Sequence, residues 1–227
     1  RLAEVADRLG YHRYWLAEHH SSNGLAGSAP EVLIGQVASR TSRMRIGAGG
    51  IMLSHYSPLK VAENFRMLET LFPGRIDLGI GRAPGSDQLT DQALQAGAGA
   101  AGPQQFPAQI HDMLGYLQGN LPDEHPFARI RAMPDGPGMP EIWLLGSTDQ
   151  SASLAAHFGC PFSFAYFINP NDGDRVMAAY REYFRASEIF PEPRGNVGVF
   201  VLCADTEEKA AQLMACRDLY TMRQRTG

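Results

Sequence analysis

The feature of this sequence that most constrains its fold is a repeated unit. In it, a helical stretch, a glycine or polar break and a short apolar strand follow one another. The unit reads LAEVADRLGYHRYWLAE, EVLIGQVASRTSRMRIGAGG and NFRMLETLFPGRIDLGIG, and it returns in SLAAHFGCPFSFAYF. Short strands that are apolar along nearly their whole length are typical of a parallel sheet whose outer face is covered by helices. The sequence therefore predicts the α/β fold class.

The pattern places strands at about residues 12–17, 44–53, 76–81, 141–145, 161–167 and 197–203. Six strands suit either a doubly wound sheet or part of an eight-stranded TIM barrel, and composition alone does not choose between them. Both ends of the chain lie in helical pattern, so we expect one further strand before Arg1 and one after Gly227, which favours the barrel. Residues 1–227 are accordingly expected to form one partial barrel domain.

One long insertion, at about residues 83–140, interrupts the rhythm of strands and helices. It contains the stretch QAGAGAAGPQQ, which has too few apolar side chains to order itself and is expected to be partly mobile. A helix is expected at about 105–118, followed by the Pro/Gly-rich MPDGPGMP. Because the alternation of strands and helices resumes afterwards, we interpret the segment as a long loop insertion within one domain.

Charge and composition exclude several classes of function. A formal net charge of −4 gives the chain no electrostatic reason to bind nucleic acid or an anionic membrane. No run approaches the ~20 apolar residues that span a bilayer. The three cysteines form no C-x-x-C pair, and their odd number suits a reducing cytosol. We therefore expect a cytoplasmic protein.

Small and polar residues collect where the predicted strands end. In parallel α/β folds the functional groups lie on the loops that follow the carboxyl ends of the strands. Here those loops carry a carboxylate, histidines, glycines, hydroxyls and a cation: Glu18, His19, His20, Gly49, Gly50, Ser54, His55, Tyr56, Arg82, Ser147, Thr148 and Ser151. Together they predict a pocket at one edge of the sheet.

The segment LLGSTDQSASLAAHFG is the candidate phosphate-binding turn, because Ser147, Thr148 and Ser151 lie at the expected start of a helix. Free N–H groups and the positive end of the helix dipole favour an anion there. Arg82 ends the preceding strand, and its guanidinium can bind a phosphate through two hydrogen bonds. The alternatives are that the hydroxyls only cap the helix and that Arg82 forms a salt bridge across the mouth of the barrel.

Two adjacent histidines allow three interpretations. On a regular strand, neighbouring side chains point to opposite faces, so His19 and His20 would not both face inward. This counts against a metal site, even with His55 as a third ligand, and we expect no bound metal. A single inward histidine suits acid–base work because its ordinary pKa lies near neutrality. The remaining alternative is a hydrogen-bonded histidine at the rim of the pocket.

Taken together, these motifs resemble the bacterial luciferase-like flavin monooxygenase family. The resemblance runs from about residue 1 to about residue 210 and is carried by WLAEHHSSNGLAGSAPEVL, SHYSPLKVAENFRMLETLFPGRIDLGIGRAPG and LGSTDQSASLAAHFGCPF. It implies a TIM barrel, usually a homodimer, that receives reduced FMN from a partner flavin reductase. With O2, such an enzyme oxygenates a small organic substrate.

The resemblance also implies roles for individual residues. His19 corresponds to the catalytic first histidine of the motif E-H-H, with His20 beside it. Arg82 corresponds to the arginine that binds the FMN phosphate, and Ser147, Thr148 and Ser151 to the phosphate turn. Gly49 and Gly50 stand where the family carries a cis non-prolyl peptide bond beneath the flavin ring.

Three other functions remain open at this point. A reductase that uses a deazaflavin would keep the fold and change the chemistry. A metal-dependent hydrolase could be built on the same barrel. A flavin-binding protein without turnover is the third possibility. The sequence does not identify the organic substrate.

Overall fold

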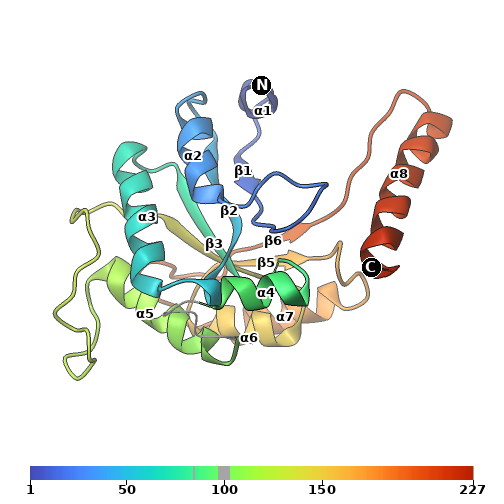
Figure 1. Cartoon of the computed structure of the whole chain (residues 1–227). Coiled ribbons are helices and arrows are strands. Elements are labelled where there is room, and N and C mark those ends of the chain that lie inside the picture. Colours follow the sequence, from blue (N-terminus) through green and yellow to red (C-terminus); the bar gives the residue numbers. More distant parts are fainter. Residues whose placement is uncertain (84, 97–102, 227) are drawn as a thin grey trace.

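The computed structural model describes residues 1–83, 85–96 and 103–226, and its centre is one sheet of six parallel strands (Figure 1). Each strand pairs with the strand that precedes it in the sequence, in the order β1 to β6. The strands are β1 (Arg13–Leu16), β2 (Arg45–Met52), β3 (Ile76–Gly81), β4 (Glu141–Gly146), β5 (Phe162–Ala165) and β6 (Gly195–Gly198).

The sheet curls into a half-barrel with helices on its outside, which confirms the expected α/β barrel class (Figure 1). A doubly wound sheet would reverse its strand order at one point, and this sheet does not. The helices are α1 (Leu2–Arg8), α2 (Pro30–Ala38), α3 (Pro58–Leu71), α4 (Gln88–Leu94), α5 (Phe106–Gln118), α6 (Asp149–His157), α7 (Gly173–Glu182) and α8 (Glu207–Thr226). Short 3-10 turns occur at η1 (Leu53–His55) and η2 (Pro103–Gln105).

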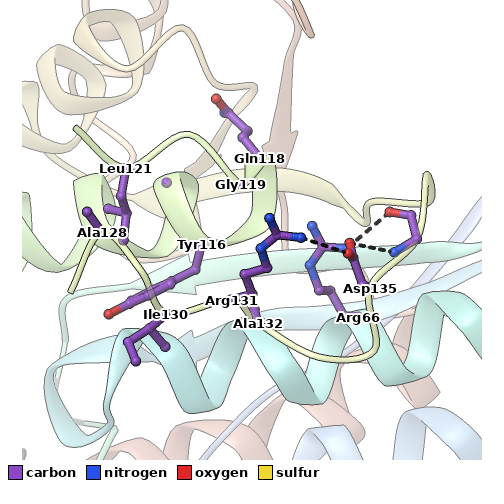
Figure 2. Close-up of a pocket in the computed structure, with 12 residues that line it drawn as sticks. Arg66, Tyr116, Gln118, Gly119, Leu121, Ala128, Ile130, Arg131, Ala132 and Asp135 are labelled. Atoms are coloured by element: carbon purple, nitrogen blue, oxygen red, sulfur yellow. Dashed lines mark hydrogen bonds and ion pairs between the residues drawn. The ribbon is translucent and has the colours of Figure 1, made fainter. Parts of the chain in front are cut away.

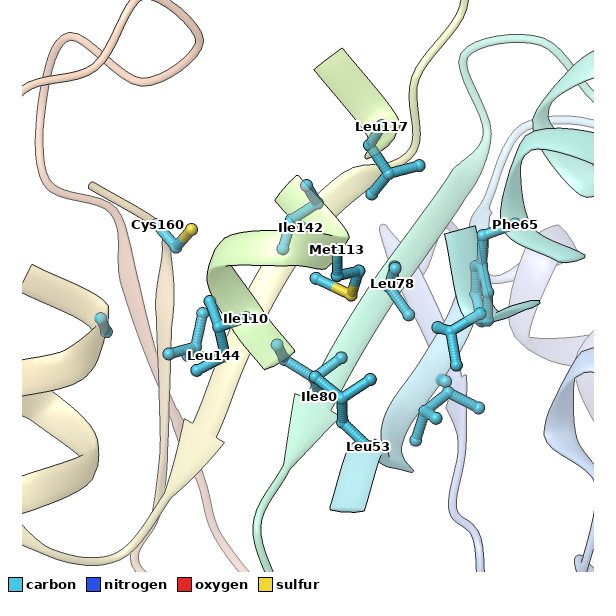
Figure 3. Close-up of a cluster of buried hydrophobic side chains, with 14 of the residues drawn as sticks. Leu53, Phe65, Leu78, Ile80, Ile110, Met113, Leu117, Ile142, Leu144 and Cys160 are labelled. Carbon is cyan, nitrogen blue, oxygen red and sulfur yellow. The ribbon is translucent and has the colours of Figure 1, made fainter. Parts of the chain in front are cut away.

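The hydrophobic core lies between the strands and the outer helices (Figure 3). Leu78 and Ile80 of β3 are completely buried there, close to Ile110 and Met113 of α5. Because side chains alternate along a strand, Asp77 and Gly79, which flank Leu78, face the concave inner side instead. The period-2 pattern of β3 thus separates an apolar outer face from an inner face of glycine and charge.

The predicted bounds of the first five strands differ from the structure by at most two residues at either end, but the last strand ends earlier than predicted. The sequence predicts a strand at about 197–203, whereas β6 spans Gly195–Gly198. Its pairing partner β5 ends at Ala165, where the chain turns and Tyr166 donates its backbone N–H to the Phe164 carbonyl. Among the described residues, the apolar run after Gly198 therefore has no neighbouring strand to bond with, and Val199, Phe200 and Val201 are exposed.

Between β3 and β4, the segment expected to be an insertion contains α4, η2 and α5. The helix expected at about 105–118 is confirmed as α5, whose buried side chains belong to the core. Most of the Ala/Gly stretch expected to be mobile, residues 97–102, lies outside the described residues. Within the described part of the chain, no helix combines the length and the apolar character needed to cross a membrane.

Candidate functional site

Glu18 is the central polar group at the carboxyl edge of the sheet. Its side chain is completely buried. It accepts hydrogen bonds from the Met52 backbone N–H at 2.8 Å and from the Tyr56 hydroxyl at 2.7 Å. Burial, together with this bond to Glu18, raises the pKa of Tyr56 well above its usual value of 10.0, so its phenol stays protonated and can donate. Glu18 therefore ties the loop after β1 to the end of β2.

The two histidines that follow Glu18 have different partners. The Nε2 atom of His20 lies 2.7 Å from the Glu18 carboxylate. The Nδ1 atom of His19 lies 3.3 Å from the Gly85 carbonyl, and the His20 backbone N–H donates to the same carbonyl at 3.2 Å. A carbonyl only accepts, so in this contact the Nδ1 atom of His19 carries the proton, and in the neutral ring its Nε2 atom then keeps a lone pair.

The expectation that alternation separates the two histidines rested on a strand that continues through them. In the structure β1 ends at Leu16, so His19 and His20 lie in the following loop. In this loop the His20 ring contacts the Glu18 carboxylate. The alternation argument therefore does not apply at these positions.

A second histidine and carboxylate lie next to this group. His55, in η1, has its Nε2 atom 3.8 Å from the Asp91 carboxylate of α4. Its ring faces that of His20 nearly at a right angle, with 6.3 Å between the ring centroids. Across residues 1–83, 85–96 and 103–226, no group of three or more His, Cys, Asp or Glu side chains is arranged to hold a metal ion.

Arg82 and the turn at the start of α6 come together at the same edge of the sheet. The strands β3 and β4 are neighbours, and the Arg82 guanidinium donates to the Gln150 side-chain oxygen at 2.5 Å. Thr148 caps α6, because its hydroxyl accepts the backbone N–H of Ser151 at 3.3 Å. The capping interpretation thus holds for Thr148. Among the described residues Arg82 pairs with this amide, and no acidic side chain lies within 4.0 Å of it.

Asp149, the first residue of α6, pairs with an arginine of α7 that also contacts Asp172. The Asp149 carboxylate lies 3.0 Å from the guanidinium of this residue, Arg175. The Ser147 carbonyl accepts a hydrogen bond from the Asn169 side chain at 3.0 Å, which fixes the turn before the helix. The negative charge of Asp149 is therefore partly offset by Arg175.

The peptide bond between Gly49 and Gly50 is cis, as the family resemblance implies. The position of Gly49 has little spare room. A Cβ atom there would lie 3.0 Å from the Cβ of Trp15, so the Trp15 side chain packs directly against this glycine on the inner face.

Sequence reasoning missed a buried charged group deeper on the inner face. Asp77 is completely buried and lies 2.5 Å from the Arg13 guanidinium and 2.7 Å from that of Arg45. Arg13 also reaches Glu141 of β4 at 2.7 Å. Each strand supplies only one of these residues, so no local motif exists. The available signal was a single charged residue at the first or second position of each otherwise apolar strand.

The two tryptophans of the chain rest on this charged group. The Trp15 indole N–H donates to Asp77 at 2.8 Å, and the Trp143 indole N–H donates to Glu141 at 2.9 Å. The two ring systems meet edge to face, with 5.4 Å between their centroids. They form an aromatic layer below the level of Gly49 and Gly50.

Comparisons with known proteins agree with this arrangement. A family model described as luciferase-like monooxygenase matches residues 1–226. The chain is 42% identical over 220 residues to an N-acetyl-S-alkylcysteine monooxygenase of Bacillus subtilis, covering 96% of this chain and 65% of that protein. It is 27% identical over 215 residues to the oxygenase component of a flavin-dependent trigonelline monooxygenase of Acinetobacter baylyi, covering 92% of this chain and 59% of that protein.

Among solved structures, the crystal structure of apo-MsnO8 superimposes with a TM-score of 0.88 at 40% sequence identity. The match covers 100% of this chain and 65% of the MsnO8 chain. The chain thus spans less than two thirds of the length of these three proteins.

Proposed function

The chain belongs to the luciferase-like monooxygenase family, and on that premise we propose that it is the flavin-binding part of a monooxygenase. The proposed enzyme uses reduced FMN and O2 to oxygenate a small organic substrate, and a separate reductase supplies the reduced flavin. One observation carries the proposal. Arg82 and the start of α6 converge at the edge of the sheet that also holds Glu18, His19 and His20.

The residues at this edge fit a flavin phosphate. A phosphate accepts hydrogen bonds from guanidinium and hydroxyl donors and is favoured at a helix N-terminus. Arg82, Ser147, Thr148 and Ser151 would hold it, with the Arg82–Gln150 hydrogen bond keeping the guanidinium at the first turn of α6. Gly49 and Gly50 would lie beneath the ring. Reduced flavin supplies the electrons with which O2 is activated.

The protein's own contribution is to position proton-transfer groups beside that ring. The Nε2 atom of His19 keeps a lone pair because its Nδ1 atom faces the Gly85 carbonyl, so His19 is the proposed base. His20 is held by Glu18, whose carboxylate orients the ring. The two histidines thus have separate roles.

We further propose that the enzyme is a homodimer, as the family resemblance implies. Apolar side chains stand exposed on neighbouring outer helices, with Val32 on α2 66% exposed and Leu71 on α3 61% exposed. Met67, one turn before Leu71 on the same face of α3, is 50% exposed. A second subunit that covers these side chains would remove apolar surface from water. Sedimentation velocity measures the oligomeric state directly, and a monomer at every concentration would contradict the dimer.

Titration with FMN, followed by oxygen uptake with reduced FMN, tests the proposed function. We expect saturable FMN binding and oxygen uptake that a suitable organic substrate couples to product formation. Preferential binding of a deazaflavin would favour the reductase alternative, and FMN binding without coupled oxidation across a substrate panel would favour a non-catalytic flavin protein. Hydrolysis that depends on an added metal would favour a hydrolase. Absence of flavin binding would reject the proposal.

A further inference from the structure

A cavity of about 380 Å³ lies far from the proposed flavin site, between α3, α5 and the segment 119–136 (Figure 2). The segment 119–136 precedes the start of β4, whereas Glu18 lies just after the end of β1, and all strands of the sheet run in the same direction. The cavity is therefore at the edge where the strands begin, opposite the edge with the histidines. Its polar lining includes Arg66, Arg131 and Asp135.

Arg66 of α3 is an unusual residue for its surroundings, since it is only 7% exposed. Its guanidinium donates to the Leu117 carbonyl and, at 3.3 Å, to the Gly136 carbonyl. Its Nε atom is buried and has no hydrogen-bond partner among the residues that the structure describes. Backbone carbonyls are dipoles without net charge, so these contacts leave the positive charge of Arg66 uncompensated.

The nearby acidic residues do not supply the missing charge. In the described part of the chain, no carboxylate lies within 4.0 Å of the Arg66 guanidinium. Glu69, three residues along α3, directs its Oε1 atom to the Gly74 backbone N–H at 2.6 Å. Burial raises the pKa of Glu69, which disfavours its charged form. A buried cation without a counter-charge is costly, and its usual solution is a bound or paired anion.

The guanidinium of a second arginine, Arg131, lines the same cavity. Arg131 lies 3.5 Å from the Asp135 carboxylate, which in turn accepts the Gly136 backbone N–H at 3.0 Å. Both arginines thus contact the Asp135–Gly136 segment, Arg66 through the Gly136 carbonyl (Figure 2). Only Arg131 is paired with the Asp135 carboxylate, and the Asp135 side chain is 63% exposed. The net local charge is positive, beside an open cavity.

We propose that this cavity binds a small oxyanion, the carboxylate or phosphate group of a small molecule, with Arg66 as the principal residue and Arg131 as the second. Guanidinium groups bind oxyanions through paired N–H donors. The volume is near the lower end of small-molecule sites, so the ligand is small. Leu121, Ile130 and Ala132 line the cavity as well and would contact an apolar part of an organic acid.

Thermal unfolding of the chain in inorganic phosphate, acetate and chloride at equal ionic strength tests the proposal. A ligand that binds only the folded state raises Tm, by about 5 °C or more at a concentration 100-fold above Kd for a chain of this size. We expect a saturable rise with phosphate, acetate or both beyond that with chloride. The more effective anion identifies the ligand class.

Four variants locate the effect. Arg66→Met should weaken the anion response at least 10-fold, and Arg131→Gln should weaken it several-fold. Arg129→Gln, a change to an exposed arginine two positions away, should leave it unchanged. Arg82→Ala removes the proposed flavin-phosphate residue and should also leave the response unchanged, so this site and the flavin site are tested separately.

Equal unfolding curves in all three anions would overturn the proposal, and so would an anion response that Arg66→Met retains or that Arg82→Ala abolishes. If Arg66→Met does not fold, Arg131→Gln decides. A weakened response in that variant supports the site, and an unchanged response rejects it.

Discussion

The carboxylate of Glu18 lies 2.7 Å from the Nε2 atom of His20, and both side chains belong to the same three-residue motif. Because Glu18 also accepts the Met52 backbone N–H and the Tyr56 hydroxyl, it joins three segments at the edge of the sheet. The three residues of the motif Glu18-His19-His20 thus have different environments in the structure. One member is a buried acceptor, and the other two are histidines with fixed partners.

Replacing Glu18 with alanine should destabilise the protein by about 3 kcal/mol, because buried donors that lose their acceptor cost about 1–3 kcal/mol each. The Met52 N–H and the Tyr56 hydroxyl are the two donors affected. Urea unfolding measures the change. Glu124→Ala, at an exposed position, is the matched control and should change stability little. Equal stability of the two variants would show that Glu18 does not hold these segments.

Arg82→Ala should raise the Kd for FMN about 10- to 100-fold, because a hydrogen bond to a charged group contributes about 1.5–3 kcal/mol. The Kd of Arg82→Lys for FMN should lie between that of the parent and that of Arg82→Ala, since an ammonium keeps the charge but not the planar pair of donors. Flavin fluorescence during titration gives the affinity. Arg129→Ala removes an exposed arginine at the other edge of the sheet and should leave the Kd unchanged. An unchanged Kd in Arg82→Ala would show that the phosphate lies elsewhere.

Much of this arrangement could be predicted from sequence because its signals are local. A break after a helix, an apolar run and a polar loop repeat along the chain, so the strands and their functional ends follow from neighbouring residues. Arg82 and the start of α6 could be placed together because consecutive strands pair in a parallel sheet.

The buried charges could not be predicted in this way, because their partners are far apart in the sequence. Asp77 meets Arg13 and Arg45 across three strands, and Arg66 meets carbonyls of Leu117 and Gly136. No spacing rule links such positions. The end of β6 could not be predicted from the sequence either, because it depends on where the neighbouring strand β5 turns away and not on the β-rich run itself.

A fall in pH should weaken the hydrogen bonds by which Asp7 attaches α1 to residues 42–44. Its carboxylate accepts backbone N–H groups of Ser42 at 2.9 Å, Met44 at 2.8 Å and Arg43 at 3.2 Å. These bonds, that from Ser42 foremost, lower the pKa of Asp7 from 3.8 to about 2. A lowered pKa means that the folded state binds the proton less readily than the unfolded state. The stabilisation is therefore complete above about pH 4 and is lost as pH falls through about 2.

Asp7→Asn tests this dependence, because asparagine keeps the shape and loses the charge. We expect the variant to be less stable than the parent at pH 7 and the difference to shrink between about pH 4 and pH 2. Urea unfolding at a series of pH values measures it, and Asp123→Asn, at an exposed position, serves as the control. A difference that does not vary with pH would assign the effect of Asp7 to packing.

The inner face of the sheet requires glycine at Gly79 more strictly than at Gly49. A Cβ atom at Gly79 would lie 2.2 Å from the backbone oxygen of Ala48, whereas one at Gly49 would lie 3.0 Å from the Cβ of Trp15. A backbone oxygen held in the sheet cannot move aside without breaking strand pairing. A side chain at 3.0 Å needs to shift by only a few tenths of an ångström.

Alanine substitutions at these positions should differ in how much stability they cost. We expect Gly49→Ala to destabilise by about 1–3 kcal/mol, the usual range for overpacking, and Gly79→Ala to exceed that range. Gly35→Ala is the control, because it lies within α2 and its Cβ would meet the nearest atom at 3.7 Å. There, alanine should stabilise by up to about 1 kcal/mol through helix propensity. Urea unfolding of the three variants gives the order, and a Gly79→Ala protein as stable as Gly49→Ala would mean that β2 and β3 can separate locally without loss of the fold.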